Sequence, residues 1–232
     1  IFKKERELEG QCANNWWNHT EFGSNQKGSA RLSDLFEGNK NIFSKPKPTE
    51  LIEGILNVTT IDDDFYILDF FSGSATTADA VMQLNAEDKG QRKYIMVQLP
   101  ELIEEDEPAY SLGYRTIDEV GRARIEKAAI KINDETNADI DYGYKLYYLE
   151  TPEEKTLVDL ENFEPEIKLI TDDMISVFDN EHASGKESIL ATWLNEDGYG
   201  LTATSTSYVL DSYEADLIEK SLYIIHEGLE EE

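Results

Sequence analysis

Apolar and polar positions alternate between short runs and turns in a way that predicts a strand, a helix and a second strand. Residues 65–71 and 94–99 are short apolar runs, and we predict that both are buried strands. Between them, the Ala-rich segment after residue 75 predicts a helix to about Leu84, closed by a loop over 85–90. Strand, helix and strand within about 35 residues predict a parallel pair with a right-handed crossover, and hence an α/β fold.

Two further helices are predicted around this unit. Pro48 precedes Thr49 and Glu50, which open a helix with an apolar face that includes Leu51 and Leu56. Thr116 and Glu119 form a capping box, and a 3.6-residue apolar period follows it. Its members are Ile117, Val120, Gly121, Arg124, Ile125, Ala128 and Ile132.

The two ends of the chain are less regular. Residues 1–40 are polar, and we expect them to be irregular, with Trp16-Trp17 either anchored on a core or stacked on a ligand. After a predicted strand at 144–149, the turn at 151–153 marks the expected domain boundary. Beyond it we predict a helix around 188–194 and short strands near 201–203 and 222–225.

Composition and charge exclude several classes of protein. The 232 residues are 40% apolar, no apolar run reaches membrane-spanning length, and the single Cys12 excludes an internal disulfide. One cysteine also suits a reducing cytoplasm. Residues 150–232 hold 22 acidic and 4 basic side chains within a total net charge of −28. This third of the chain is therefore a poor nucleic-acid surface, and is either a solvated face or a docking face for a basic partner.

The turn after residues 65–71 is the best candidate for chemistry. Asp69 ends the predicted strand, and Gly73 can supply the positive φ of a tight turn. The turn lacks the Gly-Lys-Ser/Thr of a P-loop and the glycines of a dinucleotide fingerprint. Asp69 would either order the turn by accepting backbone N–H bonds or contact a ligand amine. Thr76 and Thr77 would cap the following helix first and contact a ligand second.

Longer stretches of sequence around this turn resemble a known family. Asp-Phe-Phe-Ser-Gly-Ser-Ala-Thr-Thr-Ala-Asp-Ala-Val-Met-Gln-Leu-Asn-Ala-Glu-Asp, followed by residues 92–101, resembles the S-adenosylmethionine motif of DNA adenine-N6 methyltransferases. More narrowly, it resembles the modification (Mod) subunit of type III restriction-modification systems. Residues 23–26 and 43–51 resemble the family's motif X, and residues 113–132 and 141–146 its next helix and strand. The resemblance covers about residues 11–150, and residues 185–230 resemble the family's C-terminal region more weakly.

The resemblance implies a fold, a cofactor and site residues. It implies a partial Rossmann-like methyltransferase sheet in residues 1–150, which would bind S-adenosylmethionine, and a small acidic α+β region in residues 151–232. The turn would wrap the methionine and ribose, Lys47 and Pro48 would lie near the carboxylate, and Gln98 would bond the ribose hydroxyls. The expected cofactor-binding residues are Lys47, Pro48, Asp69, Phe70, Phe71, Gly73, Ser74, Thr76, Thr77 and Gln98, with no catalytic residue and no metal ligand.

The sequence departs from the family pattern at two places. Ala75 stands where the family usually has Gly, which would cost about 1 kcal/mol if φ is positive and would add a methyl group where the ligand approaches. The Asp/Asn-Pro-Pro-Tyr/Phe motif that holds the target adenine is missing, because the chain contains no Pro-Pro. We therefore expect the C-terminal portion of a Mod subunit, inactive alone.

The same resemblance implies partners, and two alternatives stay open. DNA would bind through segments missing from this chain, a restriction (Res) subunit would be a partner, and the full-length protein would be a homodimer. No membrane partner is expected. The alternatives are a non-catalytic interaction or dimerisation module derived from a methyltransferase, and half of a methyltransferase completed in trans.

Overall fold

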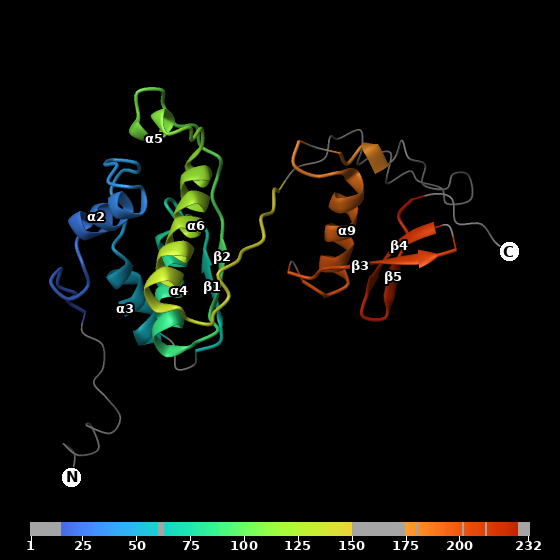
Figure 1. The fold of residues 1–232 in the computed structure, drawn as a ribbon, viewed down its shortest axis with the longest axis horizontal. Helices are drawn as coiled ribbons and strands as arrows, with labels where there is room; N and C mark the ends of the chain where they lie inside the picture. The colour runs from blue at the N-terminus through green and yellow to red at the C-terminus, as the bar shows by residue number, and fades with distance from the viewer. Residues whose placement is uncertain are drawn as a thin grey trace, which may run out of the picture. The chain divides into compact units, whose positions relative to one another are not determined.

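The computed structural model describes residues 15–59, 63–149, 175–179, 181–200, 202–211 and 213–226. The chain divides into two compact units, residues 1–143 and 144–232 (Figure 1). The first combines helices with a small parallel sheet and the second combines a helix with a small antiparallel sheet, so the protein is mixed α/β.

The first unit is built on the predicted strand, helix and strand. Strands β1 (Tyr66–Asp69) and β2 (Lys93–Met96) pair in parallel, and α4 (Thr76–Asp88) connects them, which confirms the prediction. Helix α4 runs one turn beyond the predicted end. Asn85 stays buried in that turn because its side chain bonds both the N–H and the C=O of Arg92.

Three further helices lie around α4 (Figure 1). Helices α3 (Thr49–Thr59) and α6 (Ile117–Thr136) both pack against it, and the predicted capping box at the start of α6 is confirmed. Helix α2 (Asn25–Leu35) packs on α6, so the expectation that residues 1–40 are irregular was wrong for this segment. Its N-cap is Ser24, whose hydroxyl accepts a bond from the Lys27 N–H. The short α5 (Pro108–Ser111) precedes α6.

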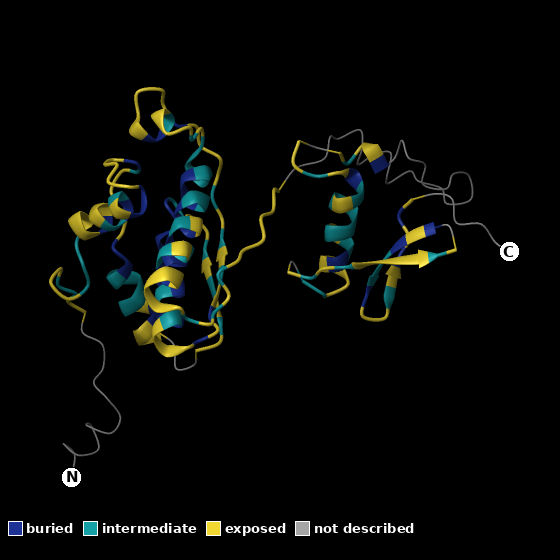
Figure 2. Cartoon of the chain, viewed as in Figure 1, coloured by how far each residue is buried: buried dark blue, intermediate teal, exposed yellow. Residues whose placement is uncertain are grey.

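The prediction that both strands are buried was wrong for one face of the sheet. One face of the sheet packs under α3 and α4, where Ile67 and Tyr94 contact Val81 and its neighbours. On the other face the register partners Leu68 and Ile95 are 60% and 42% exposed. Figure 2 shows this alternation of covered and exposed positions along β1 and β2. The described residues supply a helical layer to one face only.

The two adjacent tryptophans have different surroundings. The ring of Trp17 stacks on Phe22 with centroids 4.3 Å apart, so it does anchor its segment. Trp16 is 75% exposed, which does not fit the expectation that it is anchored on a core.

The second unit contains α9 (Gly185–Glu196) and the antiparallel strands β3 (Thr206–Leu210), β4 (Tyr213–Ile218) and β5 (Ser221–Tyr223). Its small core joins Leu194 of the helix to Ile218 and Tyr223 of the sheet. The predicted helix is confirmed and longer, and the predicted strand near 222–225 is β5. Strands β3 and β4 were not predicted.

Two predicted strands are wrong. Residues 144–149 are mostly apolar, but they pair with no strand among the described residues. Near 201–203, the described residues Thr202 and Ala203 lie outside any strand. The predicted turn at 151–153 lies outside the described residues. Among those residues, no helix has the length and apolar character needed to cross a membrane.

Candidate cofactor site

The turn between β1 and α4 is held in an unusual backbone conformation. Gly73 and Ala75 have φ angles of 51° and 56°, both in the left-handed region, which confirms the expected positive φ at Gly73. The Ala75 N–H bonds the Ser72 carbonyl at 2.8 Å, and the Ser72 N–H bonds the Val97 carbonyl at 3.2 Å. The turn is thus tied to itself and to the carboxyl end of β2.

Asp69 orders this turn. Its Oδ2 accepts a 2.6 Å bond from the Thr77 hydroxyl, and its Oδ1 accepts a 3.3 Å bond from the Phe71 N–H. Of the two roles open from the sequence, the structure places the carboxylate in the first.

Thr76 and Thr77 lie within the first turn of α4 and do not cap it. The N-cap is Ala75, which offers no side-chain bond, so the capping prediction was wrong. The Thr76 hydroxyl instead donates a 3.3 Å bond to the Lys47 carbonyl. That bond brings the segment around Lys47 and Pro48 next to the turn, although Lys47 and Thr76 are 29 residues apart in sequence.

Gln98 also reaches the turn. Its Oε1 accepts a 2.8 Å bond from the Gly73 N–H, and its Nε2 donates to the neighbouring Leu99 carbonyl at 3.2 Å. Gln98 is therefore both a brace for the turn and a polar group at the carboxyl edge of the parallel strands.

The remaining predicted residues differ in exposure. Phe70 and Phe71 are exposed, with ring centroids 5.2 Å apart, whereas Ser74 is buried. Phe43 lies against the turn, since a Cβ added at Gly73 would be 3.1 Å from its ring.

Two cavities lie near Phe43 and the segment around Lys47, and the residues that line them include neither those of the turn nor Gln98. One of about 190 Å³ is lined by Lys47 and Pro48, together with Trp17 and Ser24. An open groove of about 930 Å³ is lined by Phe43, the following residues 44–45 and the outer side of α2.

The methyl group of Ala75 points into the protein. Ala75 is 2% exposed and belongs to the main core. A Cβ added at Gly121 of α6 would lie 3.6 Å from the Ala75 methyl group and 3.1 Å from the Gly73 carbonyl oxygen, so α6 packs directly against the turn. The left-handed φ that we considered for Ala75 is present, and its methyl group is buried in the core.

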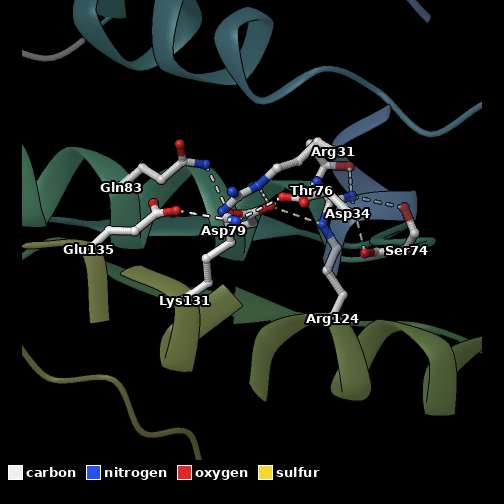
Figure 3. Close-up of polar contacts among 9 residues, drawn as sticks. All are labelled: Arg31, Asp34, Ser74, Thr76, Asp79, Gln83, Arg124, Lys131 and Glu135. Atoms are coloured by element: carbon white, nitrogen blue, oxygen red, sulfur yellow. Dashed lines mark hydrogen bonds and ion pairs between the residues drawn. The ribbon is translucent and has the colours of Figure 1, made fainter. Parts of the chain in front are cut away.

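Behind the turn lies a buried ionic network (Figure 3). Asp79 of α4 and Arg124 of α6 are both 0% exposed. Arg124 donates through Nε at 3.2 Å and Nη2 at 3.0 Å to Asp79 Oδ2, and Arg31 of α2 donates through Nη2 at 2.8 Å to Oδ1. Arg124 Nη1 contacts the turn itself, at 2.7 Å from Thr76 Oγ1 and 3.2 Å from Ser74 Oγ.

Burial shapes the electrostatics around this network. It lowers the pKa of Arg124, with Asp79 opposing the shift, and the guanidinium stays charged because its ordinary pKa is so high. On α3, burial raises the pKa of Glu53 to about 7, and the negative charges of Glu50 and Asp79 add to the effect.

Comparison with known proteins identifies the family. The family described as DNA methylase matches residues 2–116, and the one described as the type III R-M EcoP15I C-terminal domain matches residues 184–232. The StyLTI Mod subunit of Salmonella typhimurium, a type III restriction-modification enzyme, is 37% identical over 94% of this chain and 36% of its own length. The chain belongs to the family of type III restriction-modification Mod subunits.

Two further Mod subunits are similar over most of this chain. The EcoPI Mod subunit of Escherichia phage P1 is 32% identical over 97% of this chain and 34% of its own length. The EcoP15I Mod subunit of Escherichia coli is 30% identical over 84% of this chain and 28% of its own length. This member of the Mod family therefore spans about a third of the length of the curated relatives that it matches.

Sequence reasoning missed the roles of Arg124 and Asp79 in this Mod-family chain. The available signal was a charged residue inside the apolar period of α6, since an arginine at a core position needs a buried partner. Arg31 carried no such signal, because its helix was not predicted.

Proposed function

We propose that this chain is the S-adenosylmethionine-binding part of a site-specific DNA adenine-N6 methyltransferase, as the Mod subunit of a type III restriction-modification system. The observation that carries the proposal is the turn between β1 and α4. It combines a carboxylate, a strained left-handed backbone and a helix N-terminus at the carboxyl edge of parallel strands. Ligands of open α/β sheets bind at this edge.

The residues present fit such a cofactor. The inward direction of the Ala75 methyl group leaves the outer side of the turn free of added bulk, and Phe70 and Phe71 offer exposed aromatic faces beside it. The groove beside Phe43 falls within the size range of about 300–1,000 Å³ for small-molecule sites. Asp69 and Gln98 keep oxygen lone pairs beyond those used within the turn.

The chain's own residues would bind and orient the cofactor. Asp69 would attract its positively charged end, Gln98 would bond the ribose hydroxyls, and Lys47 would neutralise the carboxylate. The cofactor, when bound, supplies an activated methyl group to a nucleophile. Most of the rate enhancement would come from holding the two substrates in line.

The adenine-holding half of the site would come from another polypeptide segment. The chain contains no Pro-Pro sequence, so it lacks the motif that grips a flipped adenine. We propose that the segment carrying this motif, in cis or in trans, covers the open face of β1 and β2. That face exposes Leu68, Phe70, Ile95 and Val97 side by side, which is costly for an apolar surface left in water.

Partners follow from the same proposal. DNA would be read by segments outside this chain, since residues 150–232 hold 22 acidic and only 4 basic side chains. A Res subunit and a second copy of the full-length protein would complete the assembly in the cytoplasm.

The test is a calorimetric titration of the chain with S-adenosylmethionine, repeated for Asp69→Asn and Asp64→Asn. Asp64 is exposed and lies at the opposite, amino-terminal end of β1, where it pairs with Lys93. It therefore controls for the general attraction of a cation to a protein of net charge −28. We expect Asp69→Asn to weaken binding about tenfold or more, and Asp64→Asn to change it less than about twofold.

Absence of binding to the wild-type chain at millimolar cofactor would leave the non-catalytic interaction module as the better account of the isolated chain. Equal weakening by the two substitutions would instead show a non-specific electrostatic effect.

A further inference from the structure

We propose that Arg124 is a positioning residue that holds the β1–α4 turn in the shape that accepts the cofactor. The inference rests on the function proposed above. Arg124 Nη1 donates to Thr76 Oγ1 at 2.7 Å, to Ser74 Oγ at 3.2 Å and to the Ser74 carbonyl at 3.4 Å. Ser74 and Thr76 are the residues immediately before and after Ala75. One nitrogen thus ties both sides of the left-handed residue together.

The turn needs such a restraint. An alanine in the left-handed region is less stable than in the right-handed one, and this conformation persists only where the surroundings fix it. The Gly73 N–H bond to Gln98 and the Ser72 N–H bond to Val97 hold the first half of the turn. Arg124 holds the second half, where the backbone enters α4.

The guanidinium is itself held in one orientation. Nε and Nη2 both point at Asp79 Oδ2, which leaves Nη1 for the turn (Figure 3). Asp79 is in turn fixed by Arg31 Nη2 at 2.8 Å and by Gln83 Nε2 at 2.9 Å. A planar fork can serve a carboxylate and the turn at once, whereas a lysine ammonium on its flexible stem cannot keep both sets of bonds.

The position of these groups indicates that Arg124 acts through the turn and not on the ligand. Arg124, Ser74 and Thr76 are all buried, so none of the three bonds faces solvent. The outer side of the turn presents backbone groups, and the direction of these groups depends on the inner bonds to Arg124. Loss of Arg124 should therefore weaken cofactor binding beyond what a general loss of stability would cause.

The experiment compares Arg124→Lys with Arg92→Lys in the full chain. Arg92 is a buried arginine of the same unit, paired with Asp88 at 2.7 Å at the far end of α4, away from the turn. Each variant is measured by urea unfolding, by calorimetric titration with S-adenosylmethionine and by hydrogen exchange of the amides of residues 72–77. We expect both to lose stability. Only Arg124→Lys should weaken binding, by about tenfold or more, and speed exchange in residues 72–77.

The inference is overturned if Arg124→Lys binds the cofactor as the wild type does, or if Arg92→Lys weakens binding equally. A wild-type chain that binds no cofactor defeats the proposed function separately. If the wild type binds no cofactor, hydrogen exchange still tests whether Arg124 holds the turn. Unchanged exchange of the amides of residues 72–77 in Arg124→Lys would overturn that role, and faster exchange would support it. If Arg124→Lys does not fold, Ser74→Ala removes the bond from Arg124 Nη1 to Ser74 Oγ and leaves both the pair with Asp79 and the Thr76 bond to Lys47 in place. It should weaken binding in the same direction, and wild-type affinity would overturn the inference.

Discussion

The hydroxyl of Thr77 donates a 2.6 Å hydrogen bond to the carboxylate of Asp69, so the first turn of α4 is tied directly to the last residue of β1. This bond closes the turn across its base. A carboxylate that accepts from a buried hydroxyl in this way forms a short charge-assisted bond, stronger than one between neutral groups.

Replacing Thr77 by Val should therefore destabilise the chain by about 1.5–3 kcal/mol, because a charged acceptor loses its donor while the shape of the side chain is kept. Urea unfolding measures the change. Thr59→Val is the control, since the Thr59 hydroxyl bonds only the Ile55 carbonyl on an exposed part of α3, and it should change stability by less than about 0.5 kcal/mol. Equal effects of the two substitutions would contradict the role given to this bond.

Ala75→Gly tests the balance of strain and burial at the left-handed position. Relief of the positive φ should raise the free energy of unfolding by about 1 kcal/mol. Loss of a buried methyl group, together with the greater conformational entropy that glycine gives the unfolded chain, should lower it by about as much. We expect a net change below about 0.5 kcal/mol in the free energy of unfolding. Ala80→Gly, at a fully buried position inside the same helix, should cost about 1.5–2 kcal/mol because nothing offsets the loss. A cost at Ala75 as large as that at Ala80 would show that the positive φ carries no strain.

Glu53→Gln should alter the pH dependence of stability. The pKa of Glu53 is raised from 4.5 to about 7, so the folded state holds this proton more tightly than the unfolded state does. The resulting stabilisation is complete below about pH 4.5 and is lost as the pH rises through about 7. Glutamine mimics the protonated acid. The variant should match the wild type at pH 4 and exceed it by about 1–2 kcal/mol at pH 8, after allowance for solvent screening of a half-buried group.

Urea unfolding at the two pH values measures this difference, with Glu105→Gln as the control, since Glu105 is exposed and lies in the loop before α5. A Glu53→Gln effect that is the same at pH 4 and pH 8 would refute the raised pKa.

The open face of the sheet gives a prediction about association. Leu68→Lys should leave the stability of the isolated chain within about 0.5 kcal/mol of wild type, since Leu68 is 60% exposed. Ile67→Lys, on the covered face of the same strand, should unfold it. Co-purification with a separately expressed segment that carries a Pro-Pro motif should be lost in Leu68→Lys. Persistence of that complex would place the contact elsewhere.

The parts of the fold that depend on local sequence could be predicted. The strand, helix and strand followed from short apolar runs, and the capping box of α6 followed from Thr116 and Glu119 alone. Helix α2 was missed because part of its packing runs through a small residue, which leaves Leu32 and Leu35 as a weak apolar signal. Gly28 lies so close to the Pro46 carbonyl that an added Cβ would be 2.3 Å from it. Such a contact between distant segments leaves no periodic apolar signal.

The candidate site shows the same limit. The turn and its left-handed glycine could be predicted, because Gly73 follows a strand-ending acid. The direction of the Ala75 methyl group could not, because it depends on how another helix, α6, packs against the turn at Gly121. The predicted strand at residues 144–149 fails for a related reason, since an apolar run becomes a strand only where another strand pairs with it.

The buried network of Arg31, Asp79 and Arg124 constrains how sequences related to this one can diverge. Removing one member leaves an uncompensated charge in the core, which costs about 3–5 kcal/mol, whereas replacing the whole set by apolar residues of similar volume can be nearly neutral. Substitutions at positions 79 and 124 should therefore occur together during evolution. In a set of homologous sequences the two columns should covary, with position 31, which is partly solvated, following more loosely.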